Sequence, residues 1–183
     1  MPKLILLSGL PASGKSTLGI QLSNTLQVPF LQKDIYKELL ADVSKECSFE
    51  HSVLYGKMAQ AIVYTTAQSI LRAGGDVILE GMFYEERDGK KIREIEETMG
   101  CSIFQIQLTA NPEVLKERFQ KRLQTGQRHA IHLEHWLDRS QFDQEFDKTH
   151  LPFIEVTTFH GIIVDHTQSS QDLVNQIVDF VSQ

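Results

Sequence analysis

The strongest restriction on the fold lies near the start of the chain. An apolar run, Leu4–Leu7, leads into Gly9-Leu10-Pro11-Ala12-Ser13-Gly14-Lys15-Ser16, and an amphipathic stretch begins at Leu18. Glycines at both ends of such a loop let the backbone turn tightly. Successive N–H groups then point into one concavity and bind phosphate oxygens in front of a helix N-terminus. The order strand, loop and helix therefore predicts a phosphate-binding P-loop at the beginning of an α/β chain.

The side chains of this loop have distinct expected roles. Lys15 is expected to reach the β- and γ-phosphates of a nucleoside triphosphate, and the Ser16 hydroxyl is expected to bind Mg²⁺. The other expected nucleotide contacts are Gly9, Pro11, Ala12, Ser13, Gly14 and Thr17.

The rest of the chain alternates short apolar runs with longer amphipathic stretches. This pattern predicts an α/β fold with a mostly parallel sheet covered on both faces. The expected strands are 3–8, 28–32, 76–80, 102–109 and 161–165. The expected helices are 49–73, one opening at Asn111-Pro112, one from 131 to about 148, and 169–180. A length of 183 residues favours a single domain, 1–183.

Composition excludes several other classes of protein. With 41% hydrophobic and 23% charged residues, the chain is typical of a globular protein and unlike a disordered one. Cys47 and Cys101 are too few for a disulfide scaffold or a zinc cluster and are compatible with a reducing compartment. The run Leu4–Leu7 is far too short for a signal peptide or a membrane span. We expect a soluble, cytoplasmic protein with no membrane partner.

Positive charge is concentrated in one short segment. The formal net charge is −6, so a global basic field for nucleic acid is absent, but residues 113–131 carry five basic and two acidic groups. Arg118 and Arg122 lie one helical turn apart, and Arg128 follows a glycine. Arginines delivered by a closing lid can neutralise the charge that develops during phosphoryl transfer. This pattern favours a short helical lid over about 118–135, with a solvated helix face as the alternative.

Two carboxylates and one aromatic residue are expected at the same sheet edge. Asp34 lies just beyond the second strand, at the carboxyl edge where ligands of open parallel sheets bind, so it is a candidate base for an acceptor hydroxyl. The alternative is that Asp34 caps the following helix. Glu80 could hold Mg²⁺ through water, contact the acceptor, or serve as a structural carboxylate bound to a backbone amide. Phe83 either lines the acceptor pocket or packs under a neighbouring helix.

Other P-loop classes fit less well. The Asn-Lys-x-Asp box of guanine-selecting switches is missing. The third expected strand ends in Leu79-Glu80-Gly81 instead of the Asp-Asp or Asp-Glu that is usual in motor and AAA+ ATPases. A small phosphotransferase remains.

Together these motifs resemble the small P-loop kinases grouped with zeta toxins, chloramphenicol phosphotransferase and the polynucleotide 5′-kinase domain, an AAA-type ATP-binding kinase-like domain. The resemblance rests on residues 9–17, Asp34, Ile-Leu-Glu-Gly at 78–81, the arginines Arg118 and Arg122, and Val164-Asp165. It implies an adenylate-kinase-like core with a five-stranded parallel sheet, ATP with Mg²⁺ as cofactors, and an acceptor base at Asp34. Polynucleotide kinases usually place an arginine a few residues after this base, where the present chain has Lys37.

Three functions follow as hypotheses. The leading one is an ATP-dependent kinase that transfers the γ-phosphoryl group to a hydroxyl of a small molecule, such as a nucleotide sugar, an antibiotic or a nucleoside-like compound. The second is a polynucleotide 5′-hydroxyl kinase, for which a nucleic acid partner is less favoured by the net charge. The third is an ATP-dependent binding module in which turnover is incidental. The sequence leaves the oligomeric state open.

Overall fold

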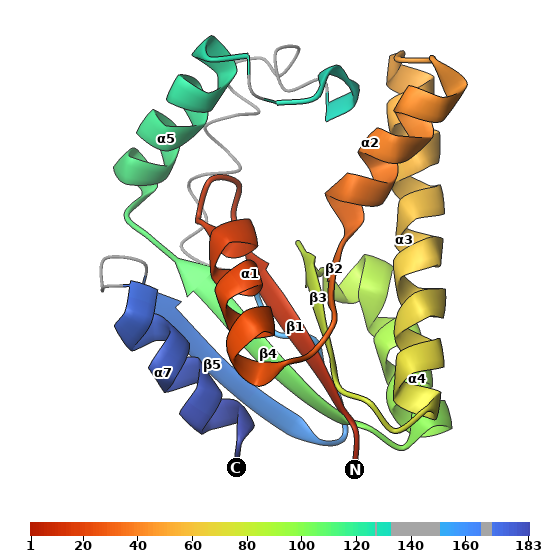
Figure 1. Cartoon of the computed structure of the whole chain (residues 1–183), viewed down its shortest axis with the longest axis vertical. Helices are drawn as coiled ribbons and strands as arrows, with labels where there is room; N and C mark the ends of the chain where they lie inside the picture. Colours follow the sequence, from red (N-terminus) through yellow and green to blue (C-terminus); the bar gives the residue numbers. More distant parts are fainter. Residues whose placement is uncertain (127, 133–150, 166–169) are drawn as a thin grey trace.

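Five strands and the helices between them form the part of the chain described by the computed structural model, residues 1–126, 128–132, 151–165 and 170–183 (Figure 1). In chain order the elements are β1 (Lys3–Gly9), α1 (Lys15–Leu26), β2 (Phe30–Gln32), α2 (Lys33–Ser44), α3 (Phe49–Arg72), β3 (Val77–Gly81), the π-helix η1 (Glu85–Gly89), α4 (Lys90–Met99), β4 (Ser102–Thr109), α5 (Pro112–Gln124), the 3₁₀ helix η2 (Ala130–His132), β5 (Phe159–Asp165) and α7 (Ser170–Val181).

The five strands form one parallel sheet in the order β2-β3-β1-β4-β5. The predicted α/β class and parallel sheet are confirmed. Strand β4 has the predicted bounds, and the other four differ from prediction by one or two residues at one or both ends. Because β1 lies at the centre of the sheet, the loop that follows it opens at the middle of the carboxyl edge.

The side chains of β1 alternate between two apolar layers, as expected for an internal strand. Leu4 and Leu6 pack in a core cluster with residues of α3 and α4, whereas Ile5 and Leu7 pack with residues of α1 and α7. All four side chains are at most 1% exposed. Burying each such side chain stabilises the fold by about 1.5–3 kcal/mol, so both layers hold the P-loop strand in place.

The helices largely follow the predicted pattern. α3 covers 49–72, one residue less than expected, and α5 begins as predicted, with the Asn111 side chain accepting a hydrogen bond from the Glu113 N–H at 2.9 Å. Of the helix expected over 131–148, residues 131 and 132 belong to the 3₁₀ helix η2, and 133–148 lie outside the described residues.

Two groups of helices extend past the carboxyl ends of the strands (Figure 1). The antiparallel pair α2 and α3 stands on one side, and α5 stands on the other, with the loop before α1 between them. This arrangement brings residues distant in sequence to the same edge of the sheet. Within the described ranges, no helix is both long and apolar enough to cross a membrane.

Candidate active site

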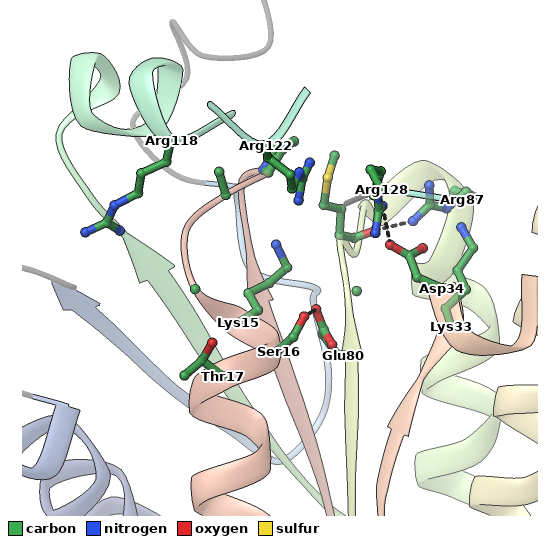
Figure 2. A pocket seen from close by; sticks show the side chains of 15 residues that line it. Lys15, Ser16, Thr17, Lys33, Asp34, Glu80, Arg87, Arg118, Arg122 and Arg128 are labelled. Atoms are coloured by element: carbon green, nitrogen blue, oxygen red, sulfur yellow. Dashed lines mark hydrogen bonds and ion pairs between the residues drawn. The ribbon is translucent and has the colours of Figure 1, made fainter. Parts of the chain in front are cut away.

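A cavity of about 500 Å³ opens at the carboxyl edge of the sheet, between the P-loop, the start of α2 and helix α5 (Figure 2). Its walls carry six cationic and two acidic side chains together with small loop residues. The lining residues are Pro11, Ala12, Gly14, Lys15, Ser16, Thr17, Lys33, Asp34, Glu80, Gly81, Met82, Arg87, Arg118, Arg122 and Arg128. Such an excess of positive charge suits a ligand with several negative charges.

The backbone of the P-loop needs glycine at both ends. Gly9 has φ +154°, and a Cβ there would lie 2.4 Å from the Leu108 carbonyl oxygen of the neighbouring strand. Gly14 has φ +91° at the N-cap position of α1, in the left-handed region that other residues rarely adopt. The loop therefore leads directly into the N-terminus of α1 beside the cavity, and a helix N-terminus is a favourable place for a phosphate.

Lys15 is the first residue of α1, directly after the N-cap Gly14. Its ammonium donates hydrogen bonds to the carbonyl oxygens of Gly9 at 2.9 Å and Leu10 at 2.8 Å. Desolvation lowers the pKa of Lys15 to about 8, although Glu80 and Asp34 partly offset this effect. The negative charge of a phosphate bound beside Lys15 would favour the charged form of its ammonium.

Ser16 and Glu80 join the start of α1 to the end of β3. The Ser16 hydroxyl donates to Glu80 Oε1 at 2.8 Å, and Gln32 Nε2 donates to Glu80 Oε2 at 2.8 Å. A hydroxyl oxygen and a carboxylate are hard oxygen donors of the kind that Mg²⁺ prefers. The residues present at this point therefore fit a Mg²⁺ ion bound together with a triphosphate. Glu80 thus accepts hydrogen bonds from two side chains. The alternative role as a structural carboxylate expected a hydrogen bond from a backbone amide instead.

Asp34 occupies the first turn of α2, at the cavity wall. Its Oδ2 accepts a hydrogen bond from Arg128 Nη2 at 2.6 Å. Burial alone would raise the pKa of Asp34, but the charge and hydrogen bond of Arg128, together with His132 when its ring is protonated, hold it below its usual value. Gln32, not Asp34, has the N-cap position of α2, so the helix-cap alternative for Asp34 is wrong. A carboxylate ionised at neutral pH thus faces the P-loop.

The three predicted arginines all line this cavity. Arg118 and Arg122 come from the same side of α5, and the Arg122 guanidinium lies over the Phe119 ring at 5.0 Å. Arg128 lies beyond the end of α5, beside Asp34. Figure 2 shows these arginines in a row across the mouth of the cavity, with Arg118 and Arg128 at opposite ends.

The segment 128–132 rests on the acidic face of α2. His132 Nε2 lies 2.7 Å from Glu38 Oε1, and His129 Nε2 lies 3.1 Å from Asp42 Oδ1. Burial and then the charge of Arg128 lower the pKa of His132, which favours a neutral ring at pH 7. The expected lid over 118–135 can be followed here only in part, because 127 and 133–135 lie outside the described residues.

Three predicted site residues do not reach the cavity. Gly9, the last residue of β1, and Ser13 are not part of the lining, and Ser13 is fully buried with no hydrogen-bond partner for its hydroxyl among the described residues. Phe83 is 3% exposed and packs in the core with residues of α3 and α4, so the acceptor-pocket interpretation of Phe83 is wrong. The Phe83 ring lies against Gly81, where a Cβ would be 3.3 Å from the ring.

Two cations at the cavity were not predicted as site residues. Lys33 directly precedes Asp34 in sequence, and this adjacency was the available signal for it. Arg87 belongs to η1, and the buried carboxylate of Asp88 holds it, with Arg87 Nη2 donating to Asp88 Oδ2 at 2.7 Å. No spacing motif of the sequence marks this arginine.

Solved structures share this fold. A provisionally assigned kinase from Chloroflexus aurantiacus J-10-fl is 27% identical, covers 98% of each chain and has a TM-score of 0.87. The APS kinase CysC of Mycobacterium tuberculosis, solved with AMPPNP and APS, is 16% identical over 100% of this chain and 98% of its own, with a TM-score of 0.66. A gluconokinase from Sinorhizobium meliloti 1021 is 16% identical over 99% and 91%, with a TM-score of 0.56.

Comparison with curated protein sequences finds no match. The model of one protein family does match, over residues 4–144, which include the P-loop, Asp34, Glu80 and the arginines up to Arg128. The chain has the fold of P-loop kinases. It belongs to the AAA domain family AAA_33.

Proposed function

We propose that this protein is an ATP-dependent kinase that transfers the γ-phosphoryl group of ATP to a hydroxyl of a small-molecule acceptor. The observation that carries the proposal is that Lys15, Ser16 and Asp34 line one cavity together with four arginines. A P-loop alone supports nucleotide binding and leaves the reaction open. A carboxylate across the cavity from the loop adds a candidate base for an attacking hydroxyl.

The nucleotide end of the cavity is the P-loop. Backbone N–H groups of the loop and the ammonium of Lys15 would hold the phosphates, and Ser16 with Glu80 would hold Mg²⁺. When bound, the metal supplies positive charge at the β- and γ-phosphate oxygens. The APS kinase CysC, solved with AMPPNP and APS, supports this assignment of the nucleotide site.

At the other end, Asp34 would orient the acceptor hydroxyl and take its proton. As the acceptor oxygen forms its bond to the γ-phosphorus, the bond from that phosphorus to the bridging oxygen of ADP breaks. A carboxylate has lone pairs on both oxygens, so Asp34 can accept this proton while Arg128 stays on Oδ2. Arg118, Arg122 and Arg128 would neutralise the charge on the transferred group.

A labelled-ATP transfer screen tests the proposal. Wild type and Lys15→Ala are incubated with hydroxyl metabolites, antibiotics and 5′-hydroxyl oligonucleotides, and labelled product is separated from ATP. Labelled small molecules that form with wild type and not with Lys15→Ala support the kinase. Labelled oligonucleotide alone supports the polynucleotide kinase instead. No transfer that depends on Lys15 overturns both.

Asp34→Ala separates the kinase from an ATP-dependent binding module. A kinase loses acceptor phosphorylation in this variant and still binds ATP, because the P-loop is unchanged. A binding module keeps its partner affinity. Acceptor phosphorylation that survives in Asp34→Ala contradicts the role of Asp34 as base.

A further inference from the structure

A second cavity, of about 710 Å³, lies between α2, α3 and the segment from η1 into α4. It is larger than the nucleotide cavity and within the size range of small-molecule sites. It is lined by Lys33, Lys37, Ser52, Val53, Gly56, Lys57, Gln60, Ala61, Tyr64, Thr65, Arg87, Asp88 and Lys91. None of the P-loop residues belongs to this set, so the second cavity is distinct from the phosphate-binding part of the first.

The two cavities meet at Lys33 and Arg87, which line both. Lys33 is the first residue of α2 and Asp34 the second, so the boundary lies one residue from the candidate base. Figure 2 shows Lys33 and Arg87 on the Asp34 side of the nucleotide cavity, away from Lys15. The second cavity is therefore the neighbour of the nucleotide cavity on the side of Asp34.

The second cavity has an excess of positive charge. Five cationic side chains line it, Lys33, Lys37, Lys57, Arg87 and Lys91, against the single carboxylate of Asp88. Lys91 also pairs with Glu94 at 2.8 Å, but Glu94 is not part of the lining.

Asp88 is paired with Arg87 and offsets the charge of that one cation. The residue is 1% exposed, and its carboxylate accepts hydrogen bonds from the Tyr64 hydroxyl at 3.0 Å, the Tyr84 N–H at 2.9 Å and the Arg87 guanidinium. Its contacts point into the protein and hold Arg87 at the boundary between the cavities. Because this carboxylate pairs with Arg87, the excess positive charge of the lining comes from its four lysines, Lys33, Lys37, Lys57 and Lys91.

The surroundings of two of these lysines, Lys37 and Lys33, are well defined. Lys37 Nζ donates to Ser52 Oγ at 2.8 Å, which ties α2 to α3 across the cavity. Burial and the nearby charge of Arg87 lower the pKa of Lys33. Like charges gathered on one wall repel each other, and a bound anion would remove that repulsion.

We propose that the acceptor is a small hydroxyl compound carrying an anionic group, a phosphate or a carboxylate, and that Lys37, Lys57 and Arg87 bind this group in the second cavity. This inference rests on the proposed function for the identity of the cavity's occupant. The hydroxyl end lies at Asp34, and the anionic end lies between α2 and α3. The cavity volume of about 710 Å³ is within the range of small-molecule sites.

Binding to matched compounds tests the inference without requiring transfer. The P-loop is first saturated with AMPPNP and Mg²⁺. Glycerol, ribose and glucose are then each compared with their own carboxylate and phosphate-ester forms by calorimetric titration. We expect at least one anionic form to bind roughly tenfold tighter than its neutral parent, and the arm it belongs to distinguishes phosphate from carboxylate. A 5′-hydroxyl oligonucleotide is titrated in parallel.

Two lysine variants place the anion. Lys57→Gln removes a charge from the cavity wall and is expected to weaken binding of the anionic compound roughly tenfold. Lys90→Gln makes the same change at an exposed lysine outside the lining and is expected to leave that affinity unchanged. The inference is overturned if no anionic form binds better than its neutral parent, if Lys57→Gln behaves as Lys90→Gln, or if only the oligonucleotide binds through Lys57.

Failure of this inference and failure of the proposed function give different results. Binding of an anionic compound that depends on Lys57, without its phosphorylation by ATP, counts against the kinase and leaves the anion site standing. Phosphorylation of neutral compounds, unaffected by Lys57→Gln, leaves the kinase standing and removes the anion site.

Discussion

Arg128 Nη2 lies 2.6 Å from Asp34 Oδ2, and this ion pair joins the segment after α5 to the first turn of α2 across 94 residues of sequence. The candidate base of the reaction therefore contacts one of the arginines expected to neutralise the transferred group. The protonation of Asp34 is therefore coupled to the presence of Arg128.

Replacing the base should remove chemistry and retain nucleotide binding. Asp34→Asn keeps the size of the side chain but cannot take a proton from the acceptor, so we expect kcat to fall by about 10²–10⁴-fold. The dissociation constant for ATP should change little. Steady-state kinetics and nucleotide titration measure the two effects, with Asp42→Asn on the same face of α2 as the matched control. Equal losses in both variants would show that Asp34 has no special role.

Removing Arg128 should move the acid limb of the pH profile. Arg128 is a main cause of the lowered pKa of Asp34, so the base stays ionised to lower pH in wild type than it would alone. In Arg128→Ala this pKa rises toward its usual value, and activity at low pH is lost at a higher pH than in wild type. A profile of kcat/KM against pH measures the shift. Lys121→Ala, an exposed position on α5, should leave the limb in place.

Nucleotide binding should be coupled to proton uptake by Lys15. With a pKa of about 8, this side chain is partly deprotonated in the free protein above that pH. The charges of a bound triphosphate favour the ammonium, so we expect uptake of up to one proton at about pH 9 and none from this group at about pH 6. Calorimetry in buffers of different ionisation enthalpy measures the uptake. The uptake should vanish in Lys15→Ala, and its persistence there would assign it to another group.

Glu80→Gln should weaken the metal site. The amide keeps the size of the side chain but loses the anionic oxygens beside Ser16, so the Mg²⁺ concentration for half-maximal activity should rise roughly tenfold. Activity measured against Mg²⁺ at saturating ATP tests this. Glu86→Gln, at an exposed position of η1 outside the cavity lining, is the control and should not alter the Mg²⁺ requirement.

Two helical glycines should respond in opposite directions to alanine. A Cβ at Gly19 would lie 2.2 Å from the Phe30 ring, so Gly19→Ala must displace an aromatic side chain of the core and should lower the free energy of unfolding by about 1 kcal/mol. Gly56 in α3 has no atom within 4 Å of such a Cβ, and Gly56→Ala should raise it by about 0.5–1 kcal/mol. Urea unfolding of both variants measures the two changes in the free energy of unfolding. A Gly19→Ala variant as stable as wild type would show that the Phe30 ring can move aside without cost.

Much of the fold was predictable because its signals are local. Between its ends, strand β4 is apolar apart from Gln105 and Gln107, and its bounds are those that the sequence predicts. Strand β2 begins at Phe30, two residues later than the sequence predicts. The Val28 N–H donates back to the Ser23 carbonyl at the end of α1, and Pro29 has no N–H to give a neighbouring strand.

The site divides in the same way. Lys15, Ser16 and Asp34 could be found from loop chemistry and from the carboxyl edge of the sheet. Arg87 could not, because its position depends on buried contacts of Asp88 with Tyr64 and Tyr84. The burial of Phe83 likewise depends on packing against α3 and α4, which no local pattern of the sequence specifies.

The strand order β2-β3-β1-β4-β5 has a consequence for how the two cavities can change during evolution. The central strand β1 supports the P-loop, whereas most of the second cavity comes from the consecutive helices α2 and α3 beyond the β2 side of the sheet. Substitutions confined to one contiguous stretch, residues 33–65, can alter the shape and charge of that cavity while the P-loop and the arginines of α5 stay unchanged. Under the proposed function, new acceptors could thus be selected for without substitutions in the P-loop or in the arginines of α5.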